Sequence, residues 1–144
     1  MILRAALGVY MFSEMAGLDF DVRTPKGAMA ALFCGMALPC LAQPGLVLRL
    51  CIAPRLQPAT PPARELAHLL MRCFGAQALL SGVAIAAGAW TPASHRAWVG
   101  AILPFFAFDA LAYRADMLTP LGAAGDALGN VAFVACSALA IAGK

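Results

Sequence analysis

Residues 121–142, which read LGAAGDALGNVAFVACSALAIA, are long and apolar enough to cross a lipid bilayer, yet they carry Asp126 and Asn130. About 20 apolar residues, each rising ~1.5 Å along a helix, span a hydrocarbon core of about 30 Å. A carboxylate at that depth needs a polar or charged partner. The stretch therefore predicts a membrane helix that packs its polar side against other helices of this chain or of a partner subunit.

Helical spacing divides this stretch into two faces. Small and polar residues share the first face: Gly122, Gly125, Asp126, Gly129, Asn130 and Phe133. Gly125 and Gly129 form a GxxxG pair, a pattern that lets two helix backbones approach closely in a membrane. The opposite face, which includes Leu128 and Val131, is suited to lipid.

The whole chain is far more apolar than a water-soluble domain. Of its 144 residues, 62% are hydrophobic and 12% are charged, and the mean hydropathy is +0.83. Soluble domains average about 45–50% apolar and about 25% charged residues. The net charge is only +3 and the basic residues lie singly between apolar segments, so the composition predicts an integral membrane protein and no nucleic-acid partner.

The apolar segments predict an all-α membrane bundle of about four transmembrane helices, in one domain covering residues 27–144. The expected spans are residues 27–48, 73–90, 97–113 and 121–142. Pro39 and Pro44 should kink or end the first span, and the four prolines between residues 53 and 63 predict an extended connector. Residues 1–26 contain an apolar segment interrupted by Arg4 and Glu14, and we expect them to form a peripheral segment at the membrane surface.

Alternation of the spans brings five polar residues to a similar depth, because the start of the second span, the end of the third and the start of the fourth share one side of the membrane. The members of this predicted polar layer are Arg72, Gln77, Asp109, Asp126 and Asn130. Three interpretations stay open. The layer fixes the register of three helices through buried hydrogen bonds, it binds a proton, an ion or a small ligand, or it faces a partner subunit.

Small residues predict where helices pack closely. On the second span, residues at i+4 spacing form a stripe: Ala78, Gly82 and Ala86. On the fourth span, the three glycines of the polar face, Gly122, Gly125 and Gly129, predict a second close contact, which we expect to be made with the second or third span.

No catalytic motif or metal-binding pattern is found in the sequence, and the five cysteines form no CxxC pair. We therefore predict a protein that is not an enzyme and that has no intrinsic cofactor, with free thiols and bound lipid. His68 and His95 lie at opposite ends of the second span, so they cannot share one metal ion. Each is only a candidate ligand for the magnesium of chlorophyll or the iron of haem, and His95 is expected in a solvated loop.

These features together predict a non-catalytic accessory or assembly subunit of a larger membrane complex, acting through contacts with other membrane subunits and with lipids. By analogy, a respiratory or photosynthetic complex involved in electron transport is the expected host, in the mitochondrial inner membrane or the thylakoid membrane. The alternative is a small transporter, channel or ligand- or pigment-binding membrane protein that uses Arg72, Asp109 and Asp126. Lys and Arg are balanced between the two sides, so they do not set the orientation.

Overall fold

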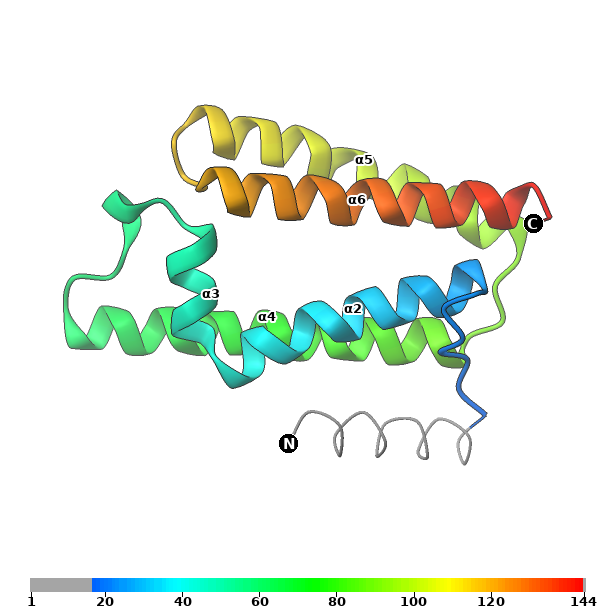
Figure 1. The fold of residues 1–144 in the computed structure, drawn as a ribbon, viewed down its shortest axis with the longest axis horizontal. Coiled ribbons are helices and arrows are strands. Elements are labelled where there is room, and N and C mark those ends of the chain that lie inside the picture. The colour runs from blue at the N-terminus through cyan, green and yellow to red at the C-terminus, as the bar shows by residue number, and fades with distance from the viewer. Residues whose placement is uncertain (1–16, 144) are drawn as a thin grey trace.

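The computed structural model describes residues 17–143, which form an all-α fold of five α-helices and one short 3-10 helix (Figure 1). The elements in chain order are α2 (Pro25–Ala42), α3 (Pro44–Cys51), η1 (Pro54–Leu56), α4 (Pro61–Ala87), α5 (Pro92–Arg114) and α6 (Pro120–Ile141). Most of the predicted peripheral segment, residues 1–16, lies outside the described residues.

The same dipeptide, Thr-Pro, starts all four long helices. The threonine is the N-cap and its side chain accepts a hydrogen bond from the backbone amide three residues later, which satisfies one of the free donors of the first turn. The proline at the first helical position has its φ angle already fixed in the helical range. The four cap residues are Thr24, Thr60, Thr91 and Thr119.

Proline also sets where the first long helix ends. The helix α2 stops at Ala42, because Pro44 has no amide hydrogen to continue it and disfavours helical geometry at Gln43. The short helix α3 then turns away from α2 (Figure 1). The connector at residues 53–63, predicted to be extended, contains η1 and the first turn of α4, since Thr60 caps α4 and Pro61 starts it.

The long helices form two antiparallel pairs. The helix α2 packs along α4, α5 packs along α6, and a smaller contact between α2 and α6 joins the pairs (Figure 1). The start of α2, the end of α4, the start of α5 and the end of α6 lie at one end of the molecule (Figure 1). This is the alternation of direction that the sequence predicts.

Among residues 17–143, three helices are long and apolar enough to cross a membrane: α2, α4 and α6. These helices support a membrane location. The predicted third span, residues 97–113, lies within α5, which falls outside this set because Arg96, Asp109 and Arg114 lower its hydropathy.

Small side chains let α2 and α4 pack with their backbones close together. A Cβ atom on Gly82 would lie 2.9 Å from the carbonyl oxygen of Ala30, and one on Gly75 would lie 3.0 Å from that of Ala37. The predicted stripe of Ala78, Gly82 and Ala86 is buried on α4, and α2 supplies its own small residues opposite it. This contact forms the larger part of the core.

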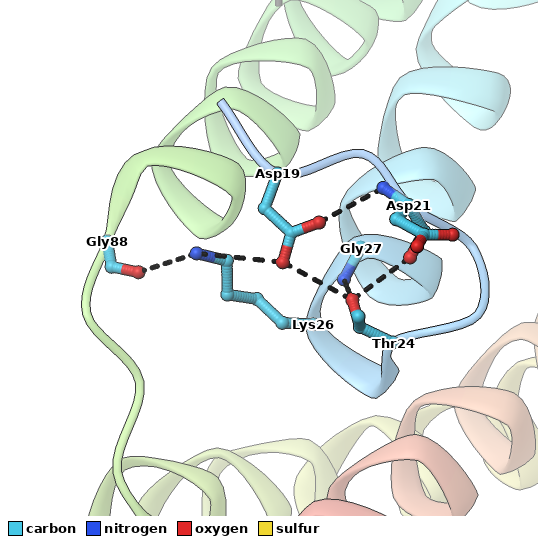
Figure 2. A network of polar contacts seen from close by, with 6 residues as sticks. All are labelled: Asp19, Asp21, Thr24, Lys26, Gly27 and Gly88. Carbon is cyan, nitrogen blue, oxygen red and sulfur yellow. Dashed lines mark hydrogen bonds and ion pairs between the residues drawn. The ribbon is translucent and has the colours of Figure 1, made fainter. Parts of the chain in front are cut away.

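A polar network at one end of the molecule joins the chain before α2 to the end of α4 (Figure 2). The Lys26 ammonium donates a hydrogen bond to the Gly88 carbonyl at 3.1 Å and lies 4.0 Å from a carboxylate oxygen of Asp19. Gly27 is required beside it, because a Cβ atom there would lie 2.1 Å from the carbonyl oxygen of Asp21.

At the opposite end, the chain after α3 is joined to the turn between α5 and α6. The Ala53 amide donates to the Met117 carbonyl and the Thr119 amide donates to the Cys51 carbonyl, each at 2.9 Å. These two bonds form a single antiparallel bridge. The two helix pairs are therefore linked at this end by the backbone, in addition to the contact between α2 and α6.

Candidate functional site

The centre of the α5–α6 contact is polar. Asp109 on α5 and Asn130 on α6 are each 7% exposed, and the Asn130 Nδ2 donates a hydrogen bond to the Asp109 Oδ2 at 2.8 Å. The other carboxylate oxygen, Asp109 Oδ1, is buried and has no hydrogen-bond partner within the described part of the chain. This pair therefore satisfies only half of the buried carboxylate.

Asp126 stands beside this pair, one helical turn before Asn130 on α6. Its side chain is more exposed than that of Asp109, and the two carboxyl groups are close enough to interact directly. Asp126 also faces the end of α3. Burial raises the pKa of the Cys51 thiol, and the nearby Asp126 carboxylate raises it further. Two acidic side chains thus share one small region of the molecule.

A cavity of about 440 Å³ lies next to these polar groups. All four long helices line it, and its walls are mainly apolar, with six aromatic side chains. The lining residues are Phe33 and Met36 of α2, Phe74 and Ser81 of α4, Trp98, Ala101, Ile102, Phe105 and Phe108 of α5, and Asp126, Gly129, Asn130 and Phe133 of α6. The cavity is therefore apolar over most of its surface and polar where Asp126 and Asn130 meet it.

Stacked rings give this cavity a firm wall. The Phe33 and Phe133 rings stack with centroids 4.5 Å apart, and Trp98 meets Phe33 edge-on at 5.7 Å. Such packing restricts the side-chain rotamers on three different helices. This aromatic group is not among the residues predicted from the sequence, although Trp98, Phe105 and Phe108 recur at helical spacing along α5 and could have indicated a shared face.

The structure brings together three of the five residues of the predicted polar layer. Asp109, Asp126 and Asn130 lie together. Arg72 and Gln77 do not join them, since both are exposed on α4 and neither makes an ion pair or side-chain hydrogen bond within residues 17–143. The reason is the packing order: α4 packs on α2 and α3, whereas the two aspartates belong to the α5–α6 pair.

The predicted glycine contact on α6 is present only at Gly122, and it is made with the end of α3 and not with the second or third span. Gly122 is buried, and a Cβ atom there would lie 2.4 Å from the Cys51 carbonyl oxygen. In contrast, a Cβ on Gly125 would meet no atom within 4 Å, and one on Gly129 would meet only the Met36 sulfur at 3.9 Å. The GxxxG pair therefore does not bring two backbones together here, and Gly129 instead leaves space that belongs to the cavity.

His95 is not the solvated loop residue that the sequence predicts. It lies in the first turn of α5, is 5% exposed, and its Nδ1 is 3.3 Å from the Ser137 hydroxyl of α6. The cause is local, because Thr91 and Ser94 form a capping box that starts α5 ahead of the histidine. A buried histidine that already has a hydrogen-bond partner is explained by packing.

His68 lies near the other end of the molecule, against α3. A Cβ atom on Gly45 would approach its Nε2 to 2.9 Å, which places the imidazole beside the α3 backbone. In the part of the chain that the structure describes, no group of three His, Cys, Asp or Glu residues is arranged to hold a metal ion. The two histidines remain separate, as their positions in the sequence predict.

Comparisons of the chain with models of protein families, with curated proteins and with solved structures found no match. The cavity and the polar groups in its wall are therefore the features from which we infer a function.

Proposed function

We propose that this chain is an integral membrane protein that binds a small, largely apolar ligand between its two helix pairs. The observation that carries the proposal is the cavity of about 440 Å³, which all four long helices line. Ligand sites are typically clefts of about 300–1,000 Å³ with mainly apolar walls and a few placed polar groups. The aromatic walls and the carboxylate and amide of Asp126 and Asn130 fit this description.

The chain direction supports four crossings of the membrane. The helices α4 and α6 run in the same direction (Figure 1), and both are apolar enough to span. If both cross, the chain has to return between them, and α5 is the segment that covers this distance. Its polar residue Asp109 is buried against α6, where lipid does not reach it.

The exposed surface also suits lipid. Large apolar side chains point outward from α4, α5 and α6. Examples are Leu80 of α4, Leu111 of α5 and Leu128 of α6, whose side chains are 65%, 65% and 70% exposed. In water such a surface would favour aggregation. In a membrane, lipid acyl chains would cover this apolar surface.

The polar pair alone does not require a ligand. Asp109 and Asn130 explain how α5 and α6 keep their register, which is the structural interpretation of the polar layer. That interpretation does not account for Asp126 in a cavity wall or for the space beside Gly129. Ligand binding accounts for both features, and we therefore prefer it to a purely structural role.

A cavity-filling substitution tests this proposal. Gly129→Leu places a side chain in the cavity, whereas Gly125→Leu adds the same side chain one turn away, where a Cβ meets no neighbouring atom. Small molecules retained by the protein after mild purification from its membrane are extracted and identified by mass spectrometry. We expect a specific compound with the wild-type chain and with Gly125→Leu, and its loss with Gly129→Leu. Equal retention by both variants would contradict the proposal.

An accessory role in a larger membrane complex is the second proposal. The observation that favours it is the outer surface of α5, which exposes Leu103, Leu111 and Tyr113 on the one long helix that is not apolar enough to be a candidate span by itself. A neighbouring protein helix would cover this surface, and the mitochondrial inner membrane or the thylakoid is the proposed setting. Native electrophoresis in mild detergent tests it, since migration of the chain only as a small free protein would reject it.

A further inference from the structure

We propose that the ligand of this cavity is a lipophilic organic cation and that Asp126 is its counter-ion. This inference rests on the ligand-binding function proposed above and adds the chemical class of the ligand. Three features of the molecule carry it: the acidic side of the cavity, the absence of a basic residue in the described wall, and the aromatic rings opposite.

The acidic groups at the cavity have no basic partner in the described chain. The ion pairs within residues 17–143 join Lys26 to Asp19 and Arg55 to Asp116, so neither Asp109 nor Asp126 is paired. Moreover, none of the described lining residues is Lys, Arg or His. Carboxylates inside a membrane are costly unless a positive charge or a proton compensates them. A bound cation supplies that charge at the place where Asp126 meets the cavity.

The carboxyl groups are also incompletely bonded. Asn130 satisfies one oxygen of Asp109 at 2.8 Å, while the buried Oδ1 lacks any donor in the described chain. The carboxylate oxygens beside the cavity are acceptors, and Asn130 gives one of its two amide hydrogens to Asp109. The carboxylate of Asp126 is the one charged group in the described wall, which favours a positively charged ligand over a carboxylate or phosphate.

The aromatic side chains complete this chemistry. Six rings line the cavity, from Phe33, Phe74, Trp98, Phe105, Phe108 and Phe133. The face of an aromatic ring carries negative potential and attracts a cation, with Trp the strongest of the three aromatic types. Rings also cover the apolar substituents of the same ligand. A cavity with aromatic walls and one carboxylate therefore fits a ligand in which a positively charged centre carries apolar substituents.

The test uses two probes of similar size that differ in charge: methyltriphenylphosphonium and the neutral triphenylphosphine oxide. The purified full chain in detergent is titrated with each, and binding is followed by calorimetry and by tryptophan fluorescence, because Trp98 lines the cavity. We expect the phosphonium to bind more tightly than the oxide. Asp126→Asn should weaken phosphonium binding at least about tenfold, as loss of one partner of a close charge pair does, while Asp126→Glu retains it.

Two further variants separate the inference from the proposed function. Gly129→Leu should abolish phosphonium binding and Gly125→Leu should leave it unchanged. One outcome overturns only the cation inference: the oxide binds as tightly as the phosphonium, Asp126→Asn has no effect, and Gly129→Leu abolishes binding of both probes. The cavity then takes a neutral ligand. If the wild-type chain binds neither probe, the cation inference is also overturned, and the retained-compound experiment decides the proposed function independently.

Discussion

The side-chain amide of Asn130 donates a hydrogen bond to the Asp109 carboxylate at 2.8 Å, across the contact between α6 and α5. The two residues are 21 positions apart in the chain and both are buried. One hydrogen bond thus sets the register of two antiparallel helices and holds an acidic group beside the aromatic cavity. The same contact serves the stability of the bundle and the chemistry of the site.

Asn130→Leu should destabilise the protein, because it leaves the buried Asp109 carboxyl without its donor. An unsatisfied buried partner costs about 1–3 kcal/mol, and more when it is charged. The double variant Asp109→Leu with Asn130→Leu should be less damaging than the single one, since neither member of this buried hydrogen bond is then left without its partner. Chemical denaturation in detergent micelles measures both. A single variant as stable as the wild type would show that the hydrogen bond contributes nothing to stability.

Gly82→Leu should weaken the contact between α2 and α4, where a Cβ would lie 2.9 Å from the Ala30 carbonyl oxygen. Overpacking of this kind costs about 1–3 kcal/mol. Gly35→Leu on α2 is the matched control, because a Cβ there meets no atom within 4 Å. Thermal unfolding in detergent should therefore show a lower midpoint for Gly82→Leu and little change for Gly35→Leu. The reverse order would mean that α2 and α4 do not pack as described.

Single cysteines introduced into a cysteine-free background test the number of crossings. Ala93 precedes the predicted third span and Asp116 follows it, at opposite ends of α5. An impermeant maleimide should label position 93 from one side of the membrane and position 116 from the other. Labelling of both from the same side would show that α5 does not cross, and the proposed four-span arrangement would then have to be abandoned.

Periodicity and composition were sufficient to predict the class of this fold, the approximate long helices and the small-residue stripe of Ala78, Gly82 and Ala86. These features follow from local rules of helix packing and hydropathy. Which helices pack against each other does not follow from such local rules. For this reason the prediction that Arg72 lies beside Asp109 and Asp126 is wrong. Placing Arg72 there required α4 to pack on α5 and α6, whereas small residues on both α2 and α4 pair those two helices instead.

The cavity was the least predictable feature. It depends on rings from four helices, and only those of α5 show a regular spacing in sequence. Gly129 was interpreted as a packing position because glycine in a membrane helix usually indicates close approach. A missing side chain either admits a neighbouring backbone or leaves a space, and the sequence does not distinguish the two. The position of His95 could have been predicted better. The capping box at Thr91 and Ser94 starts the helix before this residue and is visible in the sequence.

Asp116, in the turn between α5 and α6, should respond unusually to substitution. Its φ angle is +53°, in the left-handed region that costs residues other than glycine about 1–2 kcal/mol. Its carboxylate also lies 3.2 Å from the Arg55 Nε, but the two side chains are 80% and 52% exposed, and such exposed pairs contribute only about 0–1 kcal/mol.

The backbone effect should therefore outweigh the ion pair. Asp116→Gly loses the ion pair but removes the strain, so we expect its stability to match or exceed that of the wild type. Asp116→Ala loses the ion pair and also the local polar contacts that help Asp tolerate this geometry, so it should be the less stable variant. Denaturation of both proteins in the same detergent gives the order directly. If alanine is the more stable of the two, the left-handed geometry at position 116 does not carry the backbone strain described here.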